Sequence, residues 1–132
     1  MPDIEHAPLY AEDIDALVAA AEAPLDVMLK LLWLTGLRIS EASTLRRLDL
    51  LEDRNLIAIR RHGDFVPKTE KSTRTIPVTQ EMMAELVQLA GEDPLAAVFA
   101  CPVKCRYHYW RHRFNKARKA AGLRHFTFHD LR

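Results

Sequence analysis

The chain has few cysteines, and its hydrophobic residues are broken into short runs. Two cysteines in 132 residues are too few for a disulfide scaffold, so a reducing cytoplasm is the expected compartment. No run approaches the roughly 18–20 apolar residues of a membrane span. The acidic start lacks the layout of a signal peptide, and we find no repeat or low-complexity tract. These absences predict a soluble single domain over residues 1–132 with a modest core.

The net charge of +1 hides an uneven distribution. Residues 1–37 carry seven acidic residues and one basic residue, a net charge of −6, and residues 38–100 carry ten acidic and nine basic residues. Residues 101–132 carry nine basic residues and one acidic residue, a net charge of +8. Such a basic segment predicts a surface that faces a polyanion. A solvated helix face would show the same count.

Hydrophobic spacing predicts a mainly helical chain. Residues 25–35 are apolar nearly all round, which indicates a central buried helix. Another helix shows an inward stripe with spacings of three and four, made of Tyr107, Trp110, Phe114, Ala117 and Ala121. The expected helices cover about 11–22, 25–35, 39–47, 80–90 and 106–121.

Helix ends are marked by residues with known capping preferences. Gly36, Gly91 and Gly122 each follow a predicted helix, where glycine adopts the left-handed conformation at little cost. Thr79 precedes one helix as an N-cap. Thr127 and Asp130 have capping-box spacing, so a further helix is expected to begin near Phe128.

Strand signals lie between the third and fourth helices. Residues 55–60 alternate in polarity, and residues 65–68 and 74–78 follow after polar connections. These patterns predict a three-stranded antiparallel meander, with Pro77 placing the last strand at an edge. The expected fold class is therefore α+β, mainly helical, with the helices packed around a small antiparallel sheet.

Arg38 is the first candidate for anion chemistry. Cleaving a phosphodiester without a metal needs cations on its non-bridging oxygens, and the planar guanidinium donates two parallel hydrogen bonds. Glu41 follows three residues later and shares its helical face, so it can anchor a guanidinium. An ordinary surface pair between Arg38 and Glu41 is the alternative.

Two further segments carry candidate residues. Lys68 lies at a hairpin end, where an ammonium group can protonate a leaving alkoxide. Lys71 and Arg74 can contact phosphate, or all three cations can protect an exposed strand edge. His129 and Arg132 are three residues apart at a helix start, which combines a proton-exchanging group with a second guanidinium.

In this order the motifs resemble the tyrosine recombinase (phage integrase) catalytic domain. They are Thr-Gly-Leu-Arg-Ile-Ser-Glu at 35–41, the Lys-bearing segment 67–78 that ends in Ile-Pro-Val, and the terminal His-Asp-Leu-Arg. The resemblance extends from about Leu9 to the last residue. It implies the fold of DNA breaking-rejoining enzymes, double-stranded DNA as partner, a tetrameric synapse, and a cytoplasmic, nucleoid-associated location.

The resemblance also implies roles for individual residues. Arg38 and Arg132 would bind the scissile phosphate, Lys68 would protonate the leaving 5′-hydroxyl, and His129 would assist proton transfer. Glu41 would support the site. DNA contacts are expected from Lys71, Arg74, Arg111, Arg113 and Lys116. Family members use no metal or nucleotide cofactor and form a 3′-phosphotyrosyl intermediate.

The sequence departs from the family pattern at its ends. The nucleophilic tyrosine of the family lies beyond the position of Arg132, and Tyr10, Tyr107 and Tyr109 do not match it. We also expect no amino-terminal DNA-gripping domain of the kind that the family carries. We therefore expect a partial catalytic domain that forms no covalent DNA adduct by itself. We also expect self-association through apolar surface on residues 25–35 and on the Tyr107/Trp110/Phe114 stripe.

Two alternative interpretations remain. The first is a non-catalytic DNA-binding module with the same fold. The second is a zinc-stabilised interaction domain, since Cys101, Cys105, His108 and His112 have spacing close to that of zinc sites. Lys116 and Lys119 on the same helix face disfavour a bound cation, so no metal is expected.

Overall fold

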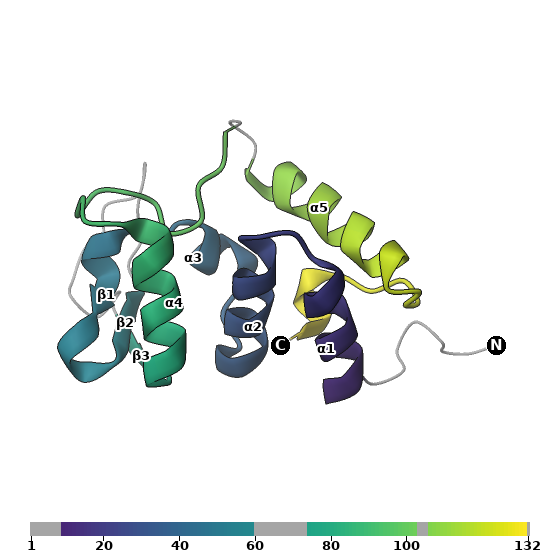
Figure 1. Ribbon diagram of the computed structural model, residues 1–132, viewed down its shortest axis with the longest axis horizontal. Helices are drawn as coiled ribbons and strands as arrows, with labels where there is room; N and C mark the ends of the chain where they lie inside the picture. The colour runs from purple at the N-terminus through teal and green to yellow at the C-terminus, as the bar shows by residue number, and fades with distance from the viewer. Residues whose placement is uncertain (1–8, 60–73, 103–105, 132) are drawn as a thin grey trace. The chain divides into compact units, whose positions relative to one another are not determined.

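The computed structural model describes residues 9–59, 74–102 and 106–131. They form two compact units (Figure 1). Unit 1 comprises Met1–Ile39 together with Cys101–Arg132, and unit 2 comprises Ser40–Ala100. Within the described ranges, no helix is both long enough and apolar enough to cross a membrane.

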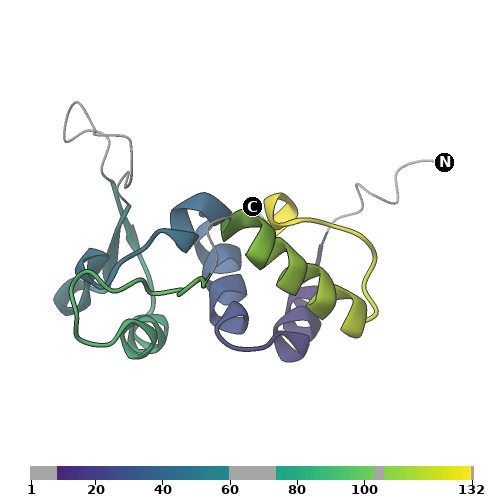
Figure 2. The same ribbon diagram turned by 90° about the horizontal axis from the view of Figure 1, so that it is seen from above.

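Unit 1 is a helical layer built around one buried helix. Helix α1 (Ala11–Ala20) packs against α2 (Leu25–Thr35), and α5 (Arg106–Ala120) packs against both (Figure 2). Six of the eleven residues of α2 are buried, which confirms the prediction of a central helix. The backbone of Gly36 has a φ of 73°, so the left-handed stop after α2 is confirmed as well.

The inward stripe of α5 is confirmed at Trp110, Phe114 and Ala117, which are all buried. It is wrong at Tyr107, whose surface is 47% exposed. Tyr107 lies in the first turn of α5, about 60° around the helix from Trp110, at the margin of the face that α1 and α2 cover. Because Trp110 and Phe114 are covered within unit 1, only Tyr107 of these three contributes to the exposed apolar surface that the sequence predicted.

Unit 2 contains an antiparallel sheet of described strands in the order β1 (Leu50–Leu51), β2 (Leu56–Ile59) and β3 (Arg74–Pro77). The count of three is confirmed, but the predicted strands are partly wrong. β2 pairs directly with β3, with Ile57 opposite Ile76, and β1 takes the remaining side of β2. The predicted middle strand, 65–68, lies outside the described residues. Among the described strands β3 is at an edge, as Pro77 predicted.

The predicted alternation of β2 is also wrong. Ile57, Ala58 and Ile59 are buried in succession. Successive side chains of a strand point to opposite faces, so both faces of β2 are covered. The 3-10 helix η2 (Arg47–Asp49) packs against β2, and β1 and β3 pair with its two edges.

The third helix is shorter than predicted. α3 (Ile39–Ser43) ends four residues before Arg47. The hydroxyl of Thr44 donates hydrogen bonds to the carbonyls of Ser40 and Glu41, at 2.9 and 3.2 Å. Beyond it the backbone turns to another partner, since the Arg47 N–H donates to the Ala96 carbonyl at 2.8 Å. Pairing with residues distant in sequence therefore ends the helix, and local propensity does not.

Helix α4 (Gln80–Ala90) matches its prediction at both ends. The Thr79 hydroxyl accepts a hydrogen bond from the Met82 N–H at 3.1 Å, which is the expected N-cap. Gly91 follows the helix with a φ of 75°. Four apolar side chains of α4 are buried within unit 2: Met82, Met83, Leu86 and Ala90.

Candidate functional site

Arg38 follows a tightly bonded turn in unit 1. The Thr35 hydroxyl donates to the Leu31 carbonyl at 2.7 Å and accepts from the Leu37 N–H at 3.3 Å. Leu37 is buried, whereas Arg38 is exposed. A helix stop at Gly36, a hydroxyl bridge and a buried leucine thus hold the backbone on the amino-terminal side of Arg38. This arrangement suits a cation that must meet an external anion.

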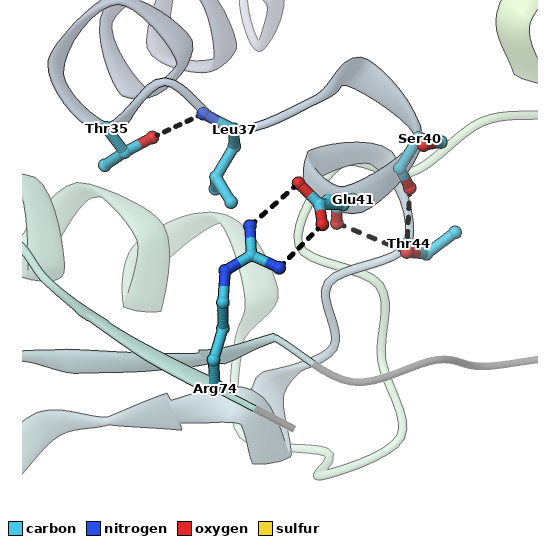
Figure 3. Close-up of polar contacts among 6 residues, drawn as sticks. All are labelled: Thr35, Leu37, Ser40, Glu41, Thr44 and Arg74. Carbon is cyan, nitrogen blue, oxygen red and sulfur yellow. Dashed lines mark hydrogen bonds and ion pairs between the residues drawn. The ribbon is translucent and has the colours of Figure 1, made fainter. Parts of the chain in front are cut away.

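Glu41 is bound by the guanidinium of Arg74 within unit 2 (Figure 3). Nη1 of Arg74 lies 2.9 Å from Oε2 of Glu41, and Nη2 lies 3.2 Å from Oε1. The two parallel hydrogen bonds form a bidentate pair between α3 and β3. The sequence predicted that Glu41 anchors a guanidinium, but it did not identify Arg74 as one, and it placed Arg74 among the DNA contacts.

His129 lies in the 3-10 helix η5 (Phe128–Leu131) of unit 1 and is exposed. The Thr127 N–H donates to Oδ2 of Asp130 at 2.8 Å, so the predicted capping interaction is present. The neighbours of His129 on the core side, Phe128 and Leu131, are buried. These contacts hold the histidine backbone and direct the exposed side away from the core.

Two aromatic contacts connect α5 with η5 and with the segment directly before it. The Phe114 ring lies 4.4 Å from the Phe128 ring and 5.5 Å from the Phe126 ring, measured between centroids. The segment that carries His129 is therefore packed onto the centre of α5. Three other candidates, Lys68, Lys71 and Arg132, lie outside the described residues.

The basic residues of α5 occupy two flanks. Lys116 Nζ lies 3.4 Å and Arg113 Nη2 lies 3.7 Å from the carboxylate oxygens of Glu22. Nη2 of Arg113 also donates to the Ala23 carbonyl at 3.5 Å. Arg111 is exposed and lies about 160° around the helix from Arg113. The three predicted DNA contacts on α5 therefore do not form one surface.

A cleft of about 400 Å³ lies beside the Glu22 contacts within unit 1. Its lining combines basic and apolar side chains from α5 with residues around the α1–α2 connection, and includes Glu22, Leu25, His112, Arg113, Lys116 and Ala117. The carboxylate of Glu22 offsets part of the positive charge here. This flank consequently has a weaker pull on an external phosphate than its residue count suggests.

The described residues do not test the complete set of predicted zinc ligands. Cys105 lies outside them, and within them no three histidine, cysteine or acidic side chains come together as metal ligands would. Cys101 is half-buried.

One structural residue escaped the sequence reasoning. Arg118 is only 8% exposed, and its Nη1 donates to the Leu123 carbonyl at 3.1 Å. This bond secures the turn after α5, where Gly122 has a φ of 72°. The sequence contains no signal for it, because arginine on a helix is usually a surface residue.

Comparisons with known proteins agree with this geometry. A family model described as "Phage integrase family" matches residues 8–132. A solved structure titled "Crystal structure of XerA recombinase" is similar in fold, with a TM-score of 0.72 and 20% sequence identity. That match covers 98% of this chain and 49% of the XerA chain, so this chain spans about half the length of that relative. No curated protein matches the chain.

Proposed function

This chain belongs to the phage integrase family, and we propose that it is the phosphate-activating part of a tyrosine recombinase catalytic domain. Its substrate is duplex DNA, and the reaction is strand cleavage and rejoining through a 3′-phosphotyrosyl intermediate in the protein that carries this chain. The observation that supports this most strongly is the exposed Arg38, which extends from the bonded turn between α2 and α3.

The proposed chemistry follows from the charge that develops on a phosphodiester during attack. Negative charge grows on the non-bridging oxygens, and a fixed guanidinium stabilises that charge. We assign Arg38 and Arg132 to these oxygens. Lys68 protonates the leaving 5′-oxygen, and His129 assists proton transfer. Glu41 supports the site from α3. No step requires a metal or a nucleotide.

Contacts to the DNA backbone come from the basic residues outside this group. Arg111 is the leading candidate on α5 because it lies away from Glu22, and Lys71 is the candidate in the lysine-bearing segment.

We further propose that the protein assembles with copies of itself on DNA, as a tetrameric synapse requires. Its cellular location is then the nucleoid in the cytoplasm.

DNA binding by this chain should weaken steeply with salt and be indifferent to sequence. Neutralising each phosphate releases counterions, so the logarithm of affinity falls with a slope of about −0.9 per contact against the logarithm of salt concentration. Reversing Arg111, Arg113 and Lys116 to glutamate together is expected to abolish binding. Filter binding or fluorescence anisotropy over a salt series measures both the affinity and the slope.

Single reversals separate the two flanks of α5. Arg111→Glu is expected to weaken binding more than Arg113→Glu, since Arg113 already lies 3.7 Å from Glu22. Equal losses would mean that the Glu22 flank also faces DNA.

Cleavage of a nicked duplex by the protein that carries this chain tests the catalytic proposal. Retained binding without cleavage would leave only a DNA-binding module.

A further inference from the structure

We propose that Arg74 is a positioning residue for the phosphate-activating site and not a DNA contact. Its guanidinium holds Glu41 and thereby fixes the helical turn that begins directly after Arg38. This inference rests on the proposed function, because it concerns the same site. It assigns to Arg74 a role that the sequence did not predict.

The Glu41–Arg74 pair differs from an ordinary surface ion pair. Both terminal nitrogens of the guanidinium face separate carboxylate oxygens, at 2.9 and 3.2 Å, in the bidentate geometry that gives the most specific pairing. The side chain of Glu41 is only 20% exposed, whereas that of Arg74 is 53% exposed. A mostly shielded carboxylate requires a charged partner, and the guanidinium approaches it from the solvent side.

Both ends of the pair are anchored in unit 2. Arg74 is the first residue of β3, and it lies opposite Ile59 of the buried strand β2. Glu41 lies in α3, where Ala42 and Ser43 are buried. The pair therefore ties the first residue of β3 to α3, the helix that follows Arg38 in the chain (Figure 3).

This arrangement explains how a short helix can carry a precise site. α3 has only five residues, which is too short for a helix to be stable alone. Glu41 lies three residues after Arg38, so a rotation or loss of this turn displaces the Arg38 backbone. A misplaced cation stabilises a transition state poorly even when substrate still binds.

Glu41 already offsets the charge of the Arg74 guanidinium. Each terminal nitrogen gives one N–H to a carboxylate oxygen, so a DNA phosphate would meet only the remaining N–H groups of a neutralised cation. Arg111 is exposed on α5 and lies away from Glu22. Removing Arg74 should therefore affect the chemical step, whereas removing Arg111 should affect DNA affinity.

The test uses the protein that carries this chain and compares Arg74→Gln, Glu41→Gln and the double variant. Each single variant is expected to slow single-turnover strand cleavage at least 10-fold, and the double variant is expected to be no slower than either one. The dissociation constant for DNA and its salt slope should stay unchanged. Arg74→Lys should recover part of the rate, because a lysine keeps the charge but lacks the planar fork.

Arg54→Gln is the matched control, since Arg54 is an exposed arginine in the 3-10 helix η3 (Glu52–Arg54) of the same unit. It should leave cleavage, affinity and salt slope unchanged. A decrease of about 0.9 in the size of the salt slope for Arg74→Gln alone would show a phosphate contact and overturn the proposal. Additive rate losses for the two singles would overturn it as well.

A wild-type protein that neither binds nor cleaves DNA would disprove the proposed function but would leave the pair testable. Urea unfolding of the chain with the same variants provides that second measurement. Non-additive changes in the unfolding midpoint for Glu41 and Arg74 would support the pair as a structural coupling. Additive changes would reject it independently of any activity.

Discussion

Replacing Phe114 with alanine is expected to lower the free energy of unfolding by about 3–5 kcal/mol, the usual range for removing a buried phenylalanine. Phe114 is 2% exposed, and its ring touches those of Phe126 and Phe128. The substitution removes apolar contacts from α5 and from the segment before His129 together. Urea denaturation followed by circular dichroism measures the loss.

Tyr107→Ala is the matched control on the same helix. Because Tyr107 is 47% exposed, the expected change in the free energy of unfolding is about 0.5 kcal/mol. A loss as large as that of Phe114→Ala would mean that Tyr107 does belong to the packed stripe, as its spacing alone predicts. A small loss of unfolding free energy for both variants would mean that the packing of η5 on α5 contributes little to stability.

The proposed function predicts that replacing Arg38 with alanine, in the protein that carries this chain, slows DNA strand cleavage by about 10²–10³-fold. This is the typical cost of removing one donor that stabilises charge in a transition state. DNA affinity should change little, because one phosphate contact among several is lost. Single-turnover cleavage of a nicked duplex separates the rate of the chemical step from the affinity.

Arg38→Lys and Arg54→Ala complete this experiment. Lysine keeps the charge but cannot donate two parallel hydrogen bonds, so Arg38→Lys should remain strongly impaired. Arg54 is an exposed arginine in η3, and its loss should leave the rate unchanged. Full cleavage activity in Arg38→Ala would show that Arg38 does not stabilise the scissile phosphate and would contradict the proposed mechanism.

For the candidate site, the sequence revealed features set by neighbouring residues, but it did not reveal contacts between distant residues. The spacing of Arg38, Glu41 and His129 was readable from the sequence, and Arg38 and His129 are exposed in the structure. The sequence did not reveal that Arg74 binds Glu41, 33 residues away. The sequence also did not reveal that Glu22 lies beside Arg113 and Lys116.

By itself the sequence determined the elements whose signals are local. The bounds of α2 and α4 match their predictions, because Gly36, Thr79 and Gly91 act within one turn of the helix that they cap. The order of the motifs likewise sufficed to indicate the family, which the match over residues 8–132 shows.

Only the tertiary structure decided the features that depend on contacts between distant residues. α3 ends early because residues 46–48 bond to residues 94–97. The two-residue strand β1 exists because β2 pairs with it, since two residues carry no periodicity of their own. The partner of Glu41 was decided in the same way. Hydrophobic spacing reports which side of a helix or strand faces inward, but packing chooses which distant group it meets.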